Sequence, residues 1–274
     1  MLHAAWKLAA TVALRILVSV VLIFSAIATA RAQVLPTTTA AVTSNIVSPN
    51  IGVTSAFDAD SLGNRSIYLD STFAPFGSLY DSGMRFRATG DASWYRFLTS
   101  ENPRTLAQGH SLEGGLLAGY AASLSGFRIT GLIGPVLGRN VYPGVITDRL
   151  GAKAVVEMYA KPTDRTMASG SISYSTTTNQ LQVQGKAGLK VVGDLYFGPE
   201  VKFKWKDILP WQVDFAPMSI TPISPQTSVA NMYIGAHISA AKVGPLMIGV
   251  SAGWANDRQL GSGFYGSAGI YIPF

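Results

Sequence analysis

Two-residue alternation of apolar and polar side chains is the feature that most constrains how this chain can fold. It is clearest in residues 180–192, where one face carries the apolar side chains Leu181, Val183, Ala187, Leu189 and Val191. The opposite face of this segment carries Gln182, Gln184, Lys186 and Lys190. Residues 194–206 repeat the pattern after a connection made of Gly193 and Asp194. A period of two indicates β-strands, and so short a connection predicts that they are adjacent and antiparallel.

The same alternation, interrupted by turn residues, recurs along most of the chain. It predicts strands near residues 50–58, 65–77, 83–98, 110–123, 126–138, 149–160, 165–176, 180–192, 194–206, 228–240, 244–256 and 262–274. The longest connection, 207–227, is rich in proline and contains Trp211. The expected fold class is therefore all-β and antiparallel.

The end of the chain and its composition favour a membrane barrel over a soluble β-sandwich. Ile270, Ile272 and Phe274 share one face of the last predicted strand, and a final strand that ends on an aromatic residue is typical of bacterial outer-membrane barrels. Charged residues make up 13% of the chain, about half of what soluble domains carry. We expect an antiparallel transmembrane β-barrel of about twelve strands, with apolar faces toward lipid and Phe274 as an assembly signal.

The first residues have the order of a secretory signal peptide. Lys7 and Arg15 precede an apolar run over 16–27, and the small-x-small sequence Ala30-Arg31-Ala32 predicts cleavage before Gln33. An uncleaved membrane helix is the alternative that these residues leave open. The expected organisation is a signal peptide at 1–32, a flexible periplasmic leader at 33–49 and an outer-membrane barrel at 50–274.

Charge and cysteine content exclude several classes of function. The formal net charge is +6, and it falls to +3 without residues 1–32, which hold three basic residues and no acid. This charge is too mild to indicate nucleic-acid binding. The chain has no cysteine, which excludes disulfides and thiolate metal sites. Neither a metal-ligand spacing nor a phosphate-binding glycine loop is present in the sequence, so no cofactor and no metal are expected.

Aromatic residues are placed as an interfacial girdle requires. With the N-terminus in the periplasm, most of the predicted outer connections are longer than the periplasmic ones, as in outer-membrane barrels. Trp94, Trp205, Trp254 and Phe264 share the apolar face of their strands and lie at the outer ends. They are predicted to form an aromatic girdle at the membrane interface. The alternative is that they are core aromatics of a soluble β-protein.

The inward faces of the predicted strands collect the charges. The candidates for a ligand site or a plug network are Arg85, Arg87, Asp91, Glu113, Glu157, Lys186, Tyr196, Glu200, Lys202, Tyr233 and His237. A barrel of about twelve strands is narrow enough for such side chains to fill much of its interior. One interpretation is a paired network that plugs and rigidifies the barrel. The other is a polar path for an anionic or hydroxyl-rich ligand.

One pair of residues raises the question of an enzyme. His237 and Ser239 share a face of one strand, as in outer-membrane lipid A deacylases, in which a histidine activates a serine and an acid orients the histidine. No glutamate follows Glu200 in the sequence, and Asp257 is the only aspartate after the strand that carries His237 and Ser239. The pair also faces the lumen, whereas lipid A approaches from the membrane. A lumen histidine with a hydrogen-bond partner is the preferred interpretation.

A set of short motifs resembles a known family. The motifs are Gly83-Met-Arg-Phe-Arg with Trp94-Tyr95, Val155-Val-Glu-Met-Tyr159, Ser171-Ile-Ser-Tyr-Ser175, Tyr196-Phe-Gly-Pro-Glu200, Ile234-Gly-Ala-His237 and Val250-Ser-Ala-Gly-Trp-Ala-Asn-Asp-Arg258. Their order and spacing are similar to those of the BcsS-type cellulose biosynthesis proteins of Gram-negative bacteria, over roughly residues 50–274. The proline-rich 207–227 connection and the Thr/Ala-rich leader depart from that family.

The resemblance implies a non-enzymatic accessory protein of cellulose production, an exopolysaccharide pathway of biofilms, located in the outer membrane. It implies no catalytic residues. The partners expected are outer-membrane lipid, the barrel assembly machinery, the glucan chain and components of the cellulose synthase complex. A general porin and a lipid A-modifying enzyme that uses His237 and Ser239 remain the alternatives.

Overall fold

The computed structural model describes residues 49–99, 105–206, 211–215, 218–222 and 230–274, and all the regular structure in these residues is β. The strands are β1 (Ile51–Asp60), β2 (Arg65–Phe73), β3 (Gly83–Leu98), β4 (Leu106–Leu124), β5 (Phe127–Tyr142), β6 (Val145–Thr163), β7 (Thr166–Ser175), β8 (Gln180–Val192), β9 (Leu195–Lys206), β10 (Trp211–Phe215), β11 (Met218–Pro222), β12 (Ala230–Val243), β13 (Leu246–Asp257) and β14 (Gly261–Pro273). The predicted signal peptide at 1–32 and residues 33–48 of the predicted leader lie outside the described residues.

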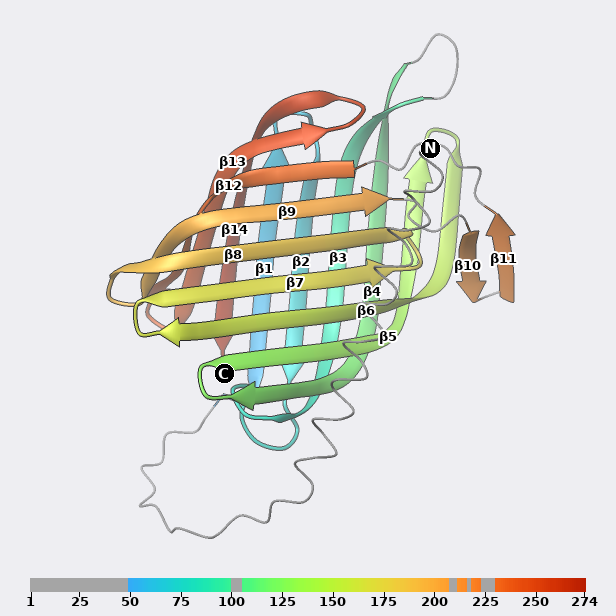
Figure 1. Cartoon of the computed structure of the whole chain (residues 1–274). Coiled ribbons are helices and arrows are strands. Elements are labelled where there is room, and N and C mark those ends of the chain that lie inside the picture. The colour runs from blue at the N-terminus through green and yellow to red at the C-terminus, as the bar shows by residue number, and fades with distance from the viewer. Residues whose placement is uncertain (1–48, 100–104, 207–210, 216–217, 223–229) are drawn as a thin grey trace, which may run out of the picture. The chain divides into compact units, whose positions relative to one another are not determined.

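Twelve of these strands close into one antiparallel barrel (Figure 1). Neighbours in the barrel are neighbours in the chain, with two exceptions. One is the pairing of β9 with β12, between which the chain forms the separate β10–β11 pair, and the other is the closure of the barrel. The barrel closes where β1 pairs with β14, from Gly52 opposite Pro273 to Asp60 opposite Tyr265. The main-chain N–H of Phe274 donates to the carbonyl of Ile51 at 2.8 Å, so the last residue belongs to this seam. The all-β, twelve-stranded barrel predicted from the sequence is confirmed.

The two faces of the strands have opposite chemistry. Large apolar side chains point outward and are exposed, such as Leu116 at 68%, Leu137 at 65% and Leu189 at 65%. Charged side chains point inward and are buried, such as Glu200 at 1% and Lys202 at 5%. A soluble protein has the reverse arrangement, whereas an outer-membrane barrel presents an apolar surface to lipid. The orientation that alternation predicts is therefore the one observed.

One sector of the barrel interior is apolar. Leu117, Leu132, Val136 and Val155, from β4, β5 and β6, form a buried cluster. The backbones of β4 and β5 approach closely here, because a Cβ on Gly119 would lie 1.8 Å from the carbonyl oxygen of Gly131. Only glycine fits such an approach. The apolar cluster fills the lumen locally, while polar residues of the same three strands, such as Glu113 and Lys153, line the cavity.

The connections define two ends of the barrel. We call the loop end the one that carries connections 61–64, 99–105, 143–144, 176–179, 207–229 and 258–260. We call the turn end the one that carries connections 74–82, 125–126, 164–165, 193–194 and 244–245. Phe274 lies at the turn end, because it pairs with Ile51 at the start of β1.

One predicted loop is wrong. The sequence predicts a long connection over 138–149, but β5 continues to Tyr142 and β6 begins at Val145, so that only Pro143 and Gly144 connect them. Gly144 has a φ of 78°, which suits glycine in a tight turn. Within this continuation Arg139 and Asp148 are directly opposed and form an exposed ion pair, with Nε and Oδ1 2.6 Å apart. This outward polar pair interrupts the apolar alternation from which the strand ends were predicted.

Candidate functional site: the barrel lumen

The barrel encloses a cavity of about 1420 Å³ to which all twelve barrel strands contribute. At the loop end its lining includes Phe97 and Lys206, and toward the turn end it includes Arg128 and Tyr271. The cavity therefore extends along the barrel rather than forming a shallow depression at one mouth. Most of the residues that line it are polar or charged, so the space is suited to water and to hydrogen-bonding ligands.

One ion-pair cluster in the lumen is built around Arg87 of β3. Its guanidinium donates two parallel hydrogen bonds to Glu157 of β6, at 2.6 and 2.7 Å. It also lies 3.2 Å from a carboxylate oxygen of Asp70 and donates to the Thr72 hydroxyl at 2.9 Å. The Tyr68 hydroxyl donates to Asp70 from the same strand. Since β4 and β5 separate β3 from β6 in the sheet, the Arg87–Glu157 pair braces the lumen across its interior.

A second cluster surrounds Glu113 of β4. Lys153 of β6 donates to this carboxylate at 2.9 Å. The hydroxyls of Ser175 and Thr177 donate to its other oxygen. Glu113 is 5% exposed, so these donors replace the water that a buried carboxylate loses. Asp91 lies directly opposite Glu113 on β3 and accepts a hydrogen bond from the Ser93 hydroxyl at 2.8 Å.

Glu200 of β9 is the centre of a third cluster and is 1% exposed. The ammonium of Lys186, its direct neighbour on β8, lies 3.2 Å away. Gln184 donates to it at 2.9 Å, and the Ser251 hydroxyl of β13 donates to its second oxygen. The carboxylate thus links β8, β9 and β13.

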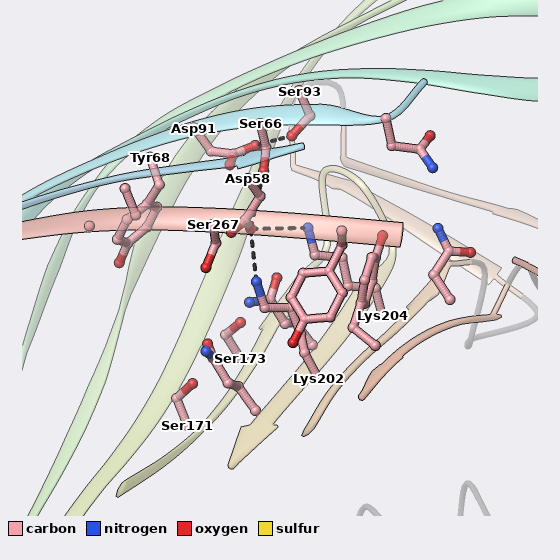
Figure 2. A pocket seen from close by; sticks show the side chains of 18 of the residues that line it. Asp58, Ser66, Tyr68, Asp91, Ser93, Ser171, Ser173, Lys202, Lys204 and Ser267 are labelled. Atoms are coloured by element: carbon pink, nitrogen blue, oxygen red, sulfur yellow. Dashed lines mark hydrogen bonds and ion pairs between the residues drawn. The ribbon is translucent and has the colours of Figure 1, made fainter. Parts of the chain in front are cut away.

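A fourth cluster spans the lumen between β1 and β9, as Figure 2 shows. Lys202 donates to Asp58 at 2.8 Å, and the ammonium of Lys204 lies 3.9 Å from the same oxygen. Both ammoniums also lie about 6 Å from the centre of the Tyr233 ring, at 5.9 and 6.0 Å. Tyr233 packs edge-to-face on Tyr265, with ring centres 5.3 Å apart. These cations therefore combine ion pairing with a cation–π contact.

Arg85 has a different environment from the other charged candidates. It is 2% exposed, and its guanidinium donates to the main-chain carbonyls of Ser78 at 3.0 Å, Leu79 at 3.2 Å and Asp81. Arg128 donates to the Leu79 carbonyl at 3.0 Å. Because Arg128 also lines the cavity, the 74–82 connection lies against the turn end of the lumen. Two guanidiniums hold its backbone there.

His237 and Ser239 are in contact, as their spacing suggests. The Nδ1 atom of His237 and the Ser239 hydroxyl are 2.8 Å apart, and Nε2 lies 3.1 Å from the carbonyl oxygen of Ala187. The carbonyl can only accept, so Nε2 carries the proton and Nδ1 accepts from the serine. In the part of the chain that the structure describes, no carboxylate is hydrogen-bonded to this histidine. His237 is 1% exposed and links β12 to β8.

The remaining candidates lie on the wall or on the outer surface. Tyr196 is 2% exposed, and the ammonium of Lys161 lies 5.8 Å from its ring centre.

The predicted girdle residues lie at the loop end. Trp94 is 39% exposed, Trp254 is 46% exposed and Phe264 is 69% exposed, while Trp205 stacks on Phe203 with ring centres 5.3 Å apart. Trp254 contacts Phe264 edge-to-face at 5.2 Å.

Sequence reasoning missed an aromatic cluster at the loop end of the cavity. The rings of Tyr95, Phe97 and Tyr142 have centres 5.9 to 6.3 Å apart. The ammonium of Lys206 lies 3.4 Å from the centre of the Tyr95 ring. The two-residue alternation of β3 places Tyr95 and Phe97 on the same face as Arg85 and Arg87, so part of this cluster was detectable. Tyr142 was not, because the sequence predicts that its strand ends earlier.

No helix of the described residues is long and apolar enough to cross a membrane. Over the same residues, no group of three or more histidine, aspartate and glutamate side chains is arranged to hold a metal ion.

Comparisons with known proteins gave a family and a fold. The model of the family described as "Cellulose biosynthesis protein BcsS" matches residues 58–204, from the end of β1 to β9. No curated protein matches the chain.

Three solved structures to which the chain is similar are membrane barrels. LpxR from Salmonella typhimurium is 12% identical with a TM-score of 0.48, over 81% of this chain and 100% of that chain. The KdgM porin is 10% identical with a TM-score of 0.41, over 81% of this chain and 99% of that chain. The beta domain of the Bordetella autotransporter Brka is 12% identical with a TM-score of 0.41, over 82% of this chain and 98% of that chain. At these identities the likeness concerns the fold alone.

Proposed function

Because the chain belongs to the BcsS family of cellulose biosynthesis proteins, we propose that it is an accessory barrel of the outer membrane. In this role it assists the export or assembly of cellulose and catalyses no reaction. The observation that carries the proposal is the family match over 58–204, which falls within a closed barrel around a polar cavity of about 1420 Å³. The apolar outer surface and the predicted signal peptide at 1–32 support the location.

The contacts of the charged lumen residues support a binding or scaffolding role over catalysis. Arg87, Glu113, Glu200 and Lys202 are each satisfied by ion pairs or hydroxyls. A catalytic acid or base needs reach to a substrate, whereas these groups are engaged with one another. In a hydrolytic triad an acid contacts the second ring nitrogen of the histidine. In this barrel the second ring nitrogen of His237 contacts the main-chain carbonyl of Ala187 instead. This contact orients the ring but adds no negative charge to stabilise an imidazolium.

The orientation follows from the chemistry of the two ends. We place the loop end outside the cell, because five of its six connections are longer than the two-residue turns that make up four of the five connections at the other end. The loop end also carries the four aromatic residues of the predicted girdle. Trp94, Trp205, Trp254 and Phe264 would then lie at the outer interface of the membrane. The turn end, with Phe274, faces the periplasm, where the barrel assembly machinery and components of the cellulose synthase complex are accessible.

Deletion of the gene tests this function. Cellulose deposited outside the cell should decrease or change its morphology, while synthase activity in inner-membrane vesicles from the same cells stays at the wild-type level. Expression of the full chain from a plasmid should restore the polymer. Unchanged yield and morphology of cellulose in the deletion strain would contradict the proposal.

A general porin is the second candidate, and the size of the cavity is the observation that favours it. Planar-bilayer recordings of the purified barrel separate the two. A non-selective porin gives a large steady conductance, whereas we expect little conductance because the cross-lumen pairs and the 74–82 connection narrow the path.

A further inference from the structure

Three neighbouring strands present a regular polar wall to the cavity. Pairing of β7 with β8 sets Ser171 opposite Gln184, Ser173 opposite Gln182 and Ser175 opposite Gln180. Pairing of β8 with β9 continues these rows to Lys202, Lys204 and Lys206 in the same order. All nine of these residues line the cavity. We call the six neutral members, Ser171, Ser173, Ser175, Gln180, Gln182 and Gln184, the Ser–Gln ladder.

Part of the ladder has unused hydrogen-bonding capacity. Ser175 donates to Glu113, and Gln184 donates to Glu200 at 2.9 Å. By contrast, the side chains of Ser171, Ser173 and Gln182 have no hydrogen-bond partner among the described residues, and they are only half-buried. Their hydroxyls and amide therefore point into the cavity with donors and acceptors that a ligand can use. Figure 2 shows Ser171 and Ser173 facing this space.

The spacing of the rows suits a polymer with a short repeat. Rows recur every second residue, which is about 6.8 Å along a strand, or about 5 Å along the barrel axis for the usual strand tilt. That distance is close to the length of one pyranose unit in an extended β-1,4-linked chain. A chain that runs along the axis would therefore advance by one row of the ladder for each sugar, while successive rows also step sideways around the wall because the strands are tilted.

The electrostatics of this wall suit a neutral ligand. Lys202 is paired with Asp58 at 2.8 Å, and Lys204 lies 3.9 Å from the same carboxylate. Lys186, in the next row toward the turn end, is paired with Glu200 at 3.2 Å. Two of the four lysines beside the ladder, Lys202 and Lys186, are thus in close ion pairs with carboxylates before any ligand enters. An anionic polymer would have to compete with these carboxylates, whereas hydroxyl groups would not.

The ladder leads to the aromatic cluster at the loop end. Lys206 belongs to the last row, with Ser175 and Gln180, and its ammonium lies over the Tyr95 ring. Tyr95, Phe97 and Tyr142 all line the cavity there. Aromatic rings pack against apolar C–H surfaces while their edges contact polar groups, which suits the flat face of a pyranose ring. Hydrogen bonding along the wall and ring packing at the mouth are complementary parts of one site.

We propose that the Ser–Gln ladder and the aromatic cluster Tyr95–Phe97–Tyr142 bind an extended, neutral β-1,4-linked glucan chain along the barrel axis. This inference rests on the proposed function and names the ligand class and the residues that contact it. The ion-pair clusters of the lumen then fix the positions of the strands that carry these residues. Ser173 and Gln182 form the row best placed to contact the ligand, because among the residues that the structure describes neither side chain has a hydrogen-bond partner.

Calorimetry with the purified full barrel in detergent tests the proposal, with cellohexaose as the probe. Maltohexaose tests the linkage, and an oligogalacturonate tests the charge. We expect cellohexaose to bind more tightly than either. The Ser173→Ala/Gln182→Ala variant should bind it about tenfold more weakly, since it removes the groups that form two neutral hydrogen bonds to the ligand. Tyr95→Ala should weaken binding as well. The matched control is Val183→Ala, which lies between two ladder residues on the other face and should bind normally.

Several results would overturn the inference. The first is absence of cellohexaose binding to the wild-type barrel. The second is an affinity of the Ser173→Ala/Gln182→Ala variant for cellohexaose equal to that of the wild type. The third is tighter binding of the oligogalacturonate than of cellohexaose to the wild-type barrel. Folding of each variant is checked by its heat-modifiable mobility in gels, and a variant that fails to fold is replaced by Ser171→Ala, which tests the adjacent row. If gene deletion alters cellulose but the barrel does not bind cellohexaose, this inference fails and the proposed function stands. If binding occurs but deletion leaves cellulose unchanged, the proposed function fails instead.

Discussion

Replacing Arg87 by leucine should strongly destabilise the barrel. The side chain of Arg87 is 9% exposed and that of Asp70 is 5% exposed, with their charged atoms 3.2 Å apart. Removing the guanidinium leaves Asp70 buried without a cation and Glu157 without its two hydrogen bonds at 2.6 and 2.7 Å. Breaking a buried pair by removing one partner costs about 3 to 5 kcal/mol. This corresponds to roughly two to four powers of ten in the unfolding equilibrium constant.

The barrel contains a matched control for this experiment. Arg139 and Asp148 form an ion pair with nearly the same geometry, at 2.6 and 2.8 Å, but their side chains are 58% and 61% exposed. Water solvates both groups when the pair is broken, so Arg139→Leu should leave stability almost unchanged. The two variants remove the same chemical group at the same distance and differ in burial.

Urea unfolding in lipid vesicles, followed by tryptophan fluorescence, measures both variants. A third variant, Arg87→Leu with Asp70→Asn and Glu157→Gln, should recover much of the stability, because it removes the uncompensated charges. Equal losses for Arg87→Leu and Arg139→Leu would refute the reasoning, since burial would then not decide the strength of the pair. Failure of the triple variant to regain stability would show that shape rather than charge is responsible.

Three further outcomes are expected. Leu116→Arg, at an outward position in the middle of β4 that is 68% exposed, should destabilise the barrel in lipid vesicles by about 2 to 4 kcal/mol, and an unchanged unfolding midpoint would argue against lipid at this face. Ser239→Ala should leave the acyl pattern of lipid A unchanged in mass spectra, because His237 and Ser239 lack an orienting acid among the described residues; loss of an acyl modification would establish an enzyme instead. Replacing the 74–82 connection by a short turn should raise single-channel conductance, because Arg85 and Arg128 hold this connection against the lumen; an unchanged conductance would mean that the restriction lies elsewhere.

The strands were predictable because lipid and lumen impose opposite chemistry on alternate residues. Residues 180–192 and 194–206 follow this rule almost without exception, and β8 and β9 form where alternation places them. The alternation of apolar and polar residues fails at the loop end of β5 and β6, beyond the apolar outer surface. Arg139 and Asp148 face outward as an ion pair, so alternation ends several residues before the strands do.

The inward face of each strand was predictable, but the partners across the lumen were not. Alternation assigns Arg87 and Glu157 to the interior, yet it contains no information on which strands face each other across the barrel. The same limit applies to the Ser–Gln ladder, because its rows depend on the register between β7 and β8. A shift by one residue would turn the serines or the glutamines toward lipid. Register is set by packing of the whole barrel, which a single segment does not encode.

Orientation of the strands is the central claim, and site-directed spin labelling tests it most directly. The chain has no cysteine, so one introduced cysteine carries the only label. In reconstituted barrels, labels at Leu116 and Leu137 should be accessible to oxygen dissolved in lipid and shielded from an aqueous nickel chelate. Labels at Ser171 and Ser173 should show the reverse. If the leucine positions were accessible to the nickel chelate and the serine positions to lipid oxygen, the assignment of an apolar exterior and a polar lumen would be contradicted.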